Sequence, residues 1–463
     1  MATAPNLVHH LRYANHHAGD DDDDEEEEED EIHHRQKRRR LPVVAWVEIL
    51  RRREERIRQR NIHRIYLTRP DLNPSPRVGT PWQHMHARGN DRVFITTMGI
   101  DVTTFKYILD QGFAETWDST PIPRNDISLN ALPHIDHRSL DAAGALGLVL
   151  HYLASTMREL SLQQIFSLIP STVTRYLSFS LQIILMVLRK IPAARIEWPR
   201  GETFNDFTDR IVERHDRLFG AFGFIDGLKL PVEESSDQDI ENSMYNGWLH
   251  DHFISNILVF APDGAHFNRF AHTNASDLLF TGTVIACHLN APGSWHDSRV
   301  AQTVYEKLRS RTPNGFYLVA DTAFPRGSAA LRRGGFICAP MKAGKVLHMT
   351  EEAMRTAVQF DNQLLSCRQA AEWGMRTIQG SFGRLRMPLP IDDTRARANL
   401  IEICVRLSNV RTRLVGISQI KEVFMPIWKE EDSGVWDLFE SMLFGQIRQR
   451  DRVSQFHLHV DEV

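Results

Sequence analysis

The sequence predicts a mixed α/β domain preceded by a mainly helical region. Between about residues 93 and 217, apolar residues recur at helical spacing, whereas short strand-like apolar runs alternate with helical segments after residue 220. The chain has 463 residues, of which 42% are hydrophobic. This is enough for one large core or for two or three domains.

Residues 1–42 carry an acidic block followed by a basic one and are expected to be disordered. Asp20–Glu31 is an unbroken run of twelve acidic residues, without which the formal net charge changes from −4 to +8. Such a run cannot bury apolar surface. The basic cluster at residues 35–40 is typical of a nuclear-import signal or a nucleic-acid contact. We therefore expect the protein in the nucleus, and otherwise in the cytoplasm.

Residues 43–92 are predicted to form a basic helix and then a linker. Arg51–Arg60 is dense in arginine, which is compatible with a nucleic-acid contact or with a solvated charged helix. Four prolines follow in residues 70–92, and this density is typical of a linker. They are Pro70, Pro74, Pro76 and Pro81.

Residues 93–217 are predicted to form a helical domain. We expect one helix near Ile100–Phe113 and another over Ser139–Ser155, with Ser139 as its N-cap. Around Pro170, two short helices joined by a tight turn fit a helix-turn-helix, and a plain helical hairpin is the alternative. In the helix-turn-helix, three side chains would face DNA: Thr172, Thr174 and Arg175.

Residues 218–395 are predicted to contain the sheet. The apolar runs that predict its strands are Phe222–Val232, Phe253–Phe260, Gly282–Leu289 and Phe316–Ala320. A helix is expected within residues 361–386 and must stop before Pro388. Residues 396–463 are expected to add a helical segment and a loose tail.

Cysteine usage and hydropathy indicate a soluble intracellular protein. The four cysteines have no CxxC spacing, so neither a disulfide framework nor a cysteine zinc site is predicted. The N-terminus does not resemble a signal peptide. The longest apolar run, Leu177–Leu188, is too short and too polar to span a bilayer, and no membrane partner is expected.

Three acidic residues occupy positions where strands or a helix would hold them rigidly. Asp226 lies inside an apolar strand, Asp321 ends another, and Glu372 lies on the predicted helix. Converging carboxylates without Cys or His ligands suit Mg²⁺ or Mn²⁺, and two such ions can activate an oxygen nucleophile for phosphodiester cleavage. Taken singly, each acid also fits a plainer role as a turn residue, a helix cap or an ion-pair partner.

Glu372 has two arginines on its own helical face. Arg368 and Arg376 lie four residues before and after it, which fits an ion-pair ladder on a solvated helix. The alternative is a metal-binding carboxylate on a helix whose arginines contact phosphate. In that alternative the DNA contacts would be Arg368, Arg376, Arg384 and Arg386.

Five sequence blocks, in order, resemble one known family. They are GFIDGLKLPV, NSMYNGWLHDHFISNILVFAPDG, LNAPGSWHDSRVA, FYLVADTAFPRG and RQAAEWGMRTIQGSFGRLRMPL. Together they resemble the DDE superfamily endonuclease domain of PIF/Harbinger transposases, closest to the fungal branch and its domesticated nuclease relatives. The resemblance covers about residues 215–392. It implies an RNase H-like mixed sheet with flanking helices and an Asp-Asp-Glu triad at Asp226, Asp321 and Glu372.

The resemblance also implies an activity and partners. It implies a metal-dependent DNA endonuclease or transposase that holds two Mg²⁺ or Mn²⁺ ions. A domesticated DNA-binding or scaffold protein that no longer cuts is the alternative. Mobile members of the family commonly rely on a separate Myb-like DNA-binding protein, and self-association into a homo-oligomer is left open.

Two features of the matching blocks have alternative interpretations. Asp297, in GSWHDSRVA, is interpreted first as the N-cap of a helix over Ser298–Ser310 and second as a metal-site residue. Residues 265–282 interrupt the joint between two predicted strands, either as a hairpin insertion or as a retained intron. Such a segment would loop out of the sheet or disrupt it.

Overall fold

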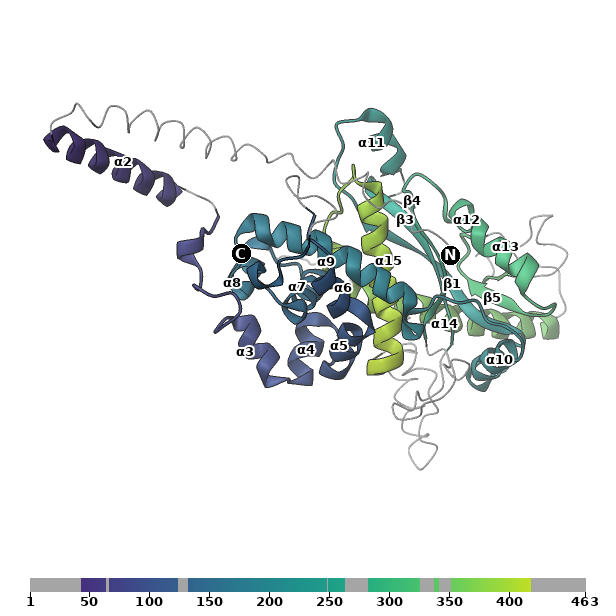
Figure 1. Ribbon diagram of the computed structural model, residues 1–463. Helices are drawn as coiled ribbons and strands as arrows, with labels where there is room; N and C mark the ends of the chain where they lie inside the picture. Colours follow the sequence, from purple (N-terminus) through teal and green to yellow (C-terminus); the bar gives the residue numbers. More distant parts are fainter. Residues whose placement is uncertain are drawn as a thin grey trace, which may run out of the picture.

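The computed structural model describes residues 43–63, 66–123, 132–247, 249–262, 282–324, 337–340 and 351–417. Helices α3 to α9 gather beside a mixed sheet, and the long helix α15 (Thr394–Val410) runs between the two (Figure 1). Helix α2 (Val43–His63) projects away from this body (Figure 1). The predicted tail of residues 1–42 lies outside the described residues, as do residues 418–463 of the predicted C-terminal segment 396–463.

The N-terminal region is helical, as the apolar spacing predicted. Its helices are α2, α3 (Pro81–Arg88), α4 (Asp91–Met98), α5 (Val102–Ile108), α6 (Ala114–Ser119), α7 (Ala142–Ala154), α8 (Glu159–Phe166), α9 (Pro170–Lys190) and α10 (Thr203–Arg214). A π-helical turn, Leu109–Phe113, joins α5 to α6, so the single helix expected near Ile100–Phe113 is interrupted. Gly112 lies inside this turn with φ of +107°, which places the kink at that residue.

The structure differs from the predicted proline-rich linker over residues 81–88. Thr80 caps α3 by accepting a hydrogen bond from the Gln83 amide, and Pro81 occupies the first helical position. Pro81 thus starts a helix instead of preventing one. Trp82 is fully buried, and a side chain at Gly147 of α7 would collide with its ring. This segment is therefore part of the helical core.

Two details of the predicted helical domain were wrong. The N-cap of α7 is Asp141, whose side chain accepts a hydrogen bond from the Gly144 amide, and not Ser139. On α9, Thr172 is buried in the core instead of facing solvent, while Thr174 is exposed. Helix α9 runs for 21 residues, whereas the helix-turn-helix prediction needs two short helices. The α8–α9 pair therefore agrees better with the plain helical hairpin.

Helix α9 is also the one helix in the described part of the chain that is long and apolar enough to cross a membrane. Its buried residues pack in the same core as α7, and 61% of the apolar window is buried within the protein. The core helix of a soluble domain has the same composition. The hydropathy of α9 is thus accounted for by packing.

The sheet is mixed, and its four main strands lie where the apolar runs predicted them. The strands are β1 (Ala221–Pro231), β2 (Tyr245–Asn246), β3 (Asp251–Phe260), β4 (Val284–Pro292), β5 (Tyr317–Ala320) and β6 (Ile337–Cys338). Their order is β4-β3-β1-β5-β6, and β2 pairs with the start of β3. The β4-β3-β1 pairs are antiparallel and the β1-β5-β6 pairs are parallel.

Helices cover both faces of this sheet. One face packs on α14 (Glu351–Ser381) and α15 and shares a core with the N-terminal helices. The other face packs on α10, α12 (Asp297–Val300) and α13 (Gln302–Arg311) in a second core. The predicted mixed α/β architecture is confirmed, and its first core is continuous with the helical region.

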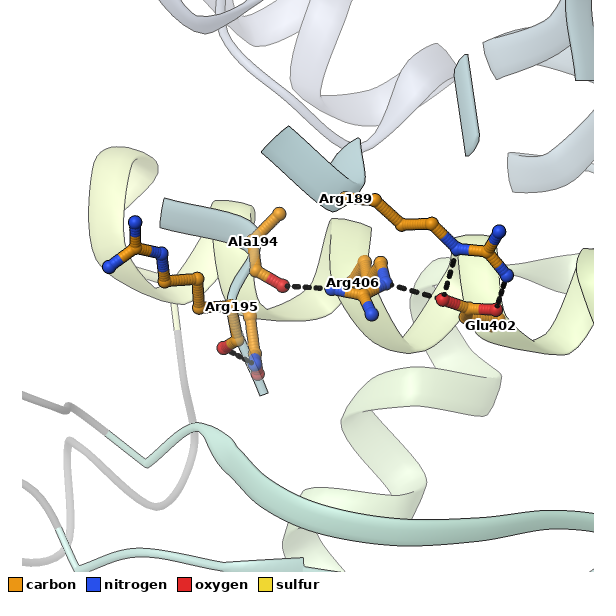
Figure 2. Close-up of polar contacts among 6 residues, drawn as sticks. Arg189, Ala194, Arg195, Glu402 and Arg406 are labelled. Atoms are coloured by element: carbon orange, nitrogen blue, oxygen red, sulfur yellow. Dashed lines mark hydrogen bonds and ion pairs between the residues drawn. The ribbon is translucent and has the colours of Figure 1, made fainter. Parts of the chain in front are cut away.

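Helix α15 joins the helical region to the sheet through a polar clamp. Glu402 accepts hydrogen bonds from Arg189 of α9, at 2.5 and 2.9 Å, and from Arg406 of its own helix, at 2.7 Å (Figure 2). One turn further, Asn409 bonds to both the amide and the carbonyl of Val284 at 2.8 and 2.9 Å. The Asn409 side chain thus satisfies the backbone amide and carbonyl of Val284 in the way that a neighbouring strand would.

Residues 263–281, which contain most of the segment 265–282, lie outside the described residues. The strands on either side of this gap are paired up to it, because Phe260 pairs with Val284 and the Ala261 amide bonds to the Thr283 carbonyl at 3.0 Å. The sheet is therefore intact at the joint.

Candidate active site

The pairing of β1 with β5 brings two of the predicted acids together. The two strands are parallel, and Ile225 pairs with Ala320. Asp226 follows the first of these residues and Asp321 the second, so the two aspartates are neighbours across adjacent strands where β5 ends. Residues that are 95 positions apart in the sequence are thus placed side by side by strand register alone.

Each of these carboxylates accepts a hydrogen bond from the next amide of its own chain. The Gly227 amide donates to Asp226 Oδ1 at 2.7 Å, and the Thr322 amide donates to Asp321 Oδ1 at 2.5 Å. These bonds fix one oxygen of each carboxylate near the backbone.

The local environment disfavours the ionised form of Asp226. Its pKa is raised from an ordinary value of 3.8 to about 6, mainly by burial and to a smaller extent by the negative charges of Asp321 and Asp297. The Gly227 amide and Arg368 act in the opposite direction. A carboxylate that is partly buried among other carboxylates is expected where a cation binds.

Helix α14 carries Glu372 across the sheet next to these strands. A side chain at Gly374 would lie 2.6 Å from the ring of Phe260 on β3, so the glycine permits this close approach. Glu372 forms an ion pair with Arg368, one turn earlier, at 2.7 Å. Arg368 also lowers the pKa of Asp226, so its charge acts on both the helix carboxylate and a strand carboxylate.

The four arginines predicted to contact DNA have different environments. Arg376 and Arg386 are exposed. Arg384 is half-buried with its guanidinium 4.4 Å from the centre of the Tyr152 ring of α7, so it stabilises the packing of the helical region. Arg368 is engaged with Glu372. Two of the four are therefore placed for contact with a ligand.

The first interpretation of Asp297, as an N-cap, was wrong. His296 is the N-cap of α12, and its ring nitrogen accepts a hydrogen bond from the Ser298 amide. Asp297 is the first helical residue, and its carboxylate lies against Gly227 of β1. The Asp297 carboxylate thus lies on the side of β1 to which position 227 points, whereas the neighbouring Asp226 side chain points to the other side.

The donor set fits a hard divalent cation. Every candidate ligand is a carboxylate, and such oxygen donors suit Mg²⁺ or Mn²⁺. In this conformation no three His, Cys, Asp or Glu side chains among the described residues converge closely enough to hold a metal ion. Glu372 is the acid occupied elsewhere, through its ion pair with Arg368. Metal binding by the predicted triad would require that ion pair to open.

Sequence reasoning missed Gly227. It was visible only as part of the IDG block, and its contact with the Asp297 carboxylate depends on how α12 packs against β1.

Comparison with known proteins gives one match. Residues 279–409 match the family model described as DDE superfamily endonuclease. The match contains Asp297, Asp321 and Glu372, and Asp226 precedes it. Among curated proteins and among solved structures, no match was found. Residues 279–409 are therefore similar to a DDE superfamily endonuclease domain, and the mixed sheet with helices on both faces agrees with the RNase H-like fold that such a domain implies.

Proposed function

We propose that this protein is a metal-dependent DNA endonuclease of the PIF/Harbinger type, able to cut DNA strands and, as a full transposase, to transfer them. The observation that carries the proposal is the parallel register that sets Asp226 beside Asp321. Two carboxylates held this close repel one another unless a cation binds between them. Glu372 on the neighbouring helix α14 supplies the third acid.

In this proposal Asp226, Asp321 and Glu372 hold two Mg²⁺ or Mn²⁺ ions. The bound ions would lower the pKa of an attacking water or 3′-hydroxyl and stabilise the charge on the scissile phosphate. The residues themselves orient the site: Gly227 and Thr322 each fix one carboxylate oxygen through their amides. If Glu372 held the metal, its ion pair with Arg368 would open, and Arg368 would then be able to pair with a DNA phosphate.

DNA would be held by basic side chains outside the acidic site. Arg376 and Arg386 are exposed on α14 and on the turn that follows it. The exposed arginines of α2 add a second basic surface away from the sheet (Figure 1). Contacts of this kind bind the phosphate backbone without reading sequence. A separate Myb-like protein would supply target recognition, in the nucleus.

A second function is favoured by the ion pair between Arg368 and Glu372. If that pair persists in the presence of metal, the triad stays incomplete. The protein would then be a domesticated DNA-binding or scaffold protein that does not cut.

Plasmid nicking distinguishes the two functions. The full chain is incubated with supercoiled DNA and Mg²⁺ or Mn²⁺, alongside Asp321→Asn and a matched control, Asp209→Asn, which alters an exposed acid on α10. The nuclease proposal expects cutting by the wild type and by Asp209→Asn but not by Asp321→Asn. Equal DNA binding by all three proteins without any cutting would support the scaffold function instead.

A further inference from the structure

A groove lies between the loop that precedes β1 and the first half of helix α14. Its volume is about 800 Å³, and it is open to solvent. Arg217 and Phe219 of the loop form one wall. The other wall is one face of α14, where the lining residues recur three and four positions apart: Ala353, Thr356, Ala357 and Phe360. The groove is therefore built by two separate elements.

Hydrogen bonds fix the two walls to one another. The side chain of Gln363 on α14 accepts a hydrogen bond from the Arg217 amide at 2.9 Å and donates one to the Asp216 carboxylate. Leu218 is fully buried, and its amide donates to the His215 carbonyl at 2.9 Å. The groove is thus preformed, so a binding partner would not have to order it.

Phe219 projects into solvent from this anchored loop. Its side chain is 70% exposed, the largest exposed fraction of any Phe, Tyr or Trp that the structure describes. Aromatic side chains are enriched at protein interfaces and contribute much of their binding energy. An exposed ring beside a preformed groove therefore indicates that another protein surface covers it.

The two walls of the groove carry opposite charges. Arg217 lies on the loop and Glu352 in the first turn of α14, and both side chains are exposed. Glu352 would repel a nucleic acid, whereas a second copy of this chain offers the same two opposite charges. A twofold rotation brings each wall of one copy to the other wall of its mate, so that the two charges meet in two reciprocal pairs.

We propose that this groove is the interface of a twofold-symmetric dimer of the chain. In the dimer, the Phe219 ring of each copy packs on the α14 face of the other copy, and Arg217 of each copy pairs with Glu352 of the other. The interface goes beyond the proposed nuclease function and does not depend on it. Phe360 lies about 18 Å from Glu372 along the axis of α14, so the interface and the candidate active site are separate.

Sedimentation equilibrium of the full chain tests the dimer. We expect a monomer–dimer equilibrium for the wild type, and a loss of more than about tenfold in dimer affinity for Phe219→Ser. The matched control is Val78→Ser, which changes an apolar residue that is 68% exposed and lies outside the groove. This control should dimerise like the wild type. Circular dichroism shows whether each variant is folded.

Charge reversal identifies the residues that meet across the interface. Arg217→Glu and Glu352→Arg each place like charges together twice in a dimer, so each should weaken dimerisation by more than about tenfold. An equimolar mixture of the two variants should recover the wild-type affinity within about threefold, because both pairs are again of opposite charge. The loop binds Gln363 through the Arg217 backbone amide, which the substitution keeps. Asp209→Arg, on exposed α10, is the control and should dimerise normally.

Three results would overturn the proposal. The first is a wild type that stays monomeric up to about 100 µM. The second is a dimer that Phe219→Ser leaves as strong as in the wild type, because the contact would then lie elsewhere. The third is a mixture of the two charge variants that stays monomeric. Sedimentation measures mass and not cutting, so each result is independent of whether the protein is a nuclease.

Discussion

Two polar clusters in this protein combine charges in opposite ways. In the clamp on α15, every interaction joins groups of complementary charge or hydrogen-bonding type: Glu402 binds Arg189 and Arg406, and Asn409 binds the backbone of Val284. In the acidic cluster on the sheet, the negative charges of Asp321 and Asp297 both disfavour the ionised form of Asp226. One oxygen of Asp297 has no partner in the described part of the chain.

The pKa shifts of Glu402 in the clamp and of Asp226 in the acidic cluster have opposite directions. Burial would raise the pKa of Glu402, but hydrogen bonds from Arg189 and Arg406 bring it below its ordinary value. Burial, together with the adjacent acids, raises the pKa of Asp226 to about 6. The clamp therefore stabilises the fold at neutral pH, whereas ionisation of Asp226 in the acidic cluster costs stability. Substitutions in the two clusters should move stability in opposite directions.

The largest expected change in stability comes from Asn409→Ala. The substitution leaves the buried amide and carbonyl of Val284 without their Asn409 partner, while the Arg195 carbonyl keeps its hydrogen bond from Arg413. We expect a loss of about 3 kcal/mol in the free energy of unfolding, measured by urea denaturation. Asn205→Ala on exposed helix α10 is the control and should change it by less than about 0.5 kcal/mol. A loss no larger than that of the control would contradict the role of Asn409.

A gain in stability is expected from Asp226→Asn. The folded-state pKa of Asp226 is higher than its ordinary value, so ionisation costs stability as the pH rises from 3.8 to about 6. Removing the charge should raise the free energy of unfolding by about 1 to 2 kcal/mol at pH 7. Denaturation at several pH values should show the gain disappearing below pH 3.8. If Asp226→Asn were less stable than the wild type at pH 7, the charge of Asp226 would not destabilise the folded state.

A smaller loss is expected from Glu402→Gln. This change keeps the shape of the side chain but removes its charge, and Arg189 is largely solvated, with 53% of its side chain exposed. We expect about 1 kcal/mol at pH 7. Because the pKa of Glu402 is lowered, the difference should vanish as the pH falls below 4.5 and through the folded-state pKa. A constant difference across this range would exclude the ion pairs as its cause.

The smallest effect on the sheet is expected from deleting residues 265–282. Ala261 already pairs with Thr283, so the deletion leaves Pro262, Asp263 and Gly264 as a three-residue hairpin loop in the same register. We expect the free energy of unfolding to change by less than about 1 kcal/mol. Loss of cooperative unfolding would show that the segment supports the sheet. Sequencing the transcript across this joint separately decides between an insertion and a retained intron.

The sequence predicted the sheet better than the site. Strands β1, β3, β4 and β5 were predicted because each is an apolar run bounded by polar or turn residues. The parallel register of β1 and β5 then makes Asp226 and Asp321 neighbours. The prolines of residues 70–92 were misinterpreted because Pro81 is compatible with the first turn of a helix as well as with a linker.

The polar contacts could not be predicted from one sequence. These contacts depend on how separate elements pack. Examples are the contact of Arg384 with the Tyr152 ring, the capping of α12 by His296 and the contact of Asp297 with Gly227. Side-chain spacing predicted the ion pair of Glu372 with Arg368 as one of two alternatives. Which partner Glu372 binds when a cation is present depends on relative affinities that local sequence does not encode.

The central claim is tested most directly by single-turnover DNA nicking. The rates are measured for the wild type, Asp226→Asn and Asn409→Ala, each at a temperature where circular dichroism shows the protein folded. The account predicts that Asp226→Asn is the most stable of the three and loses about a thousandfold in rate or more. Asn409→Ala should be the least stable and cut within about twofold of the wild type. Cutting by Asp226→Asn at the wild-type rate would contradict the assignment of the acidic cluster as the catalytic site.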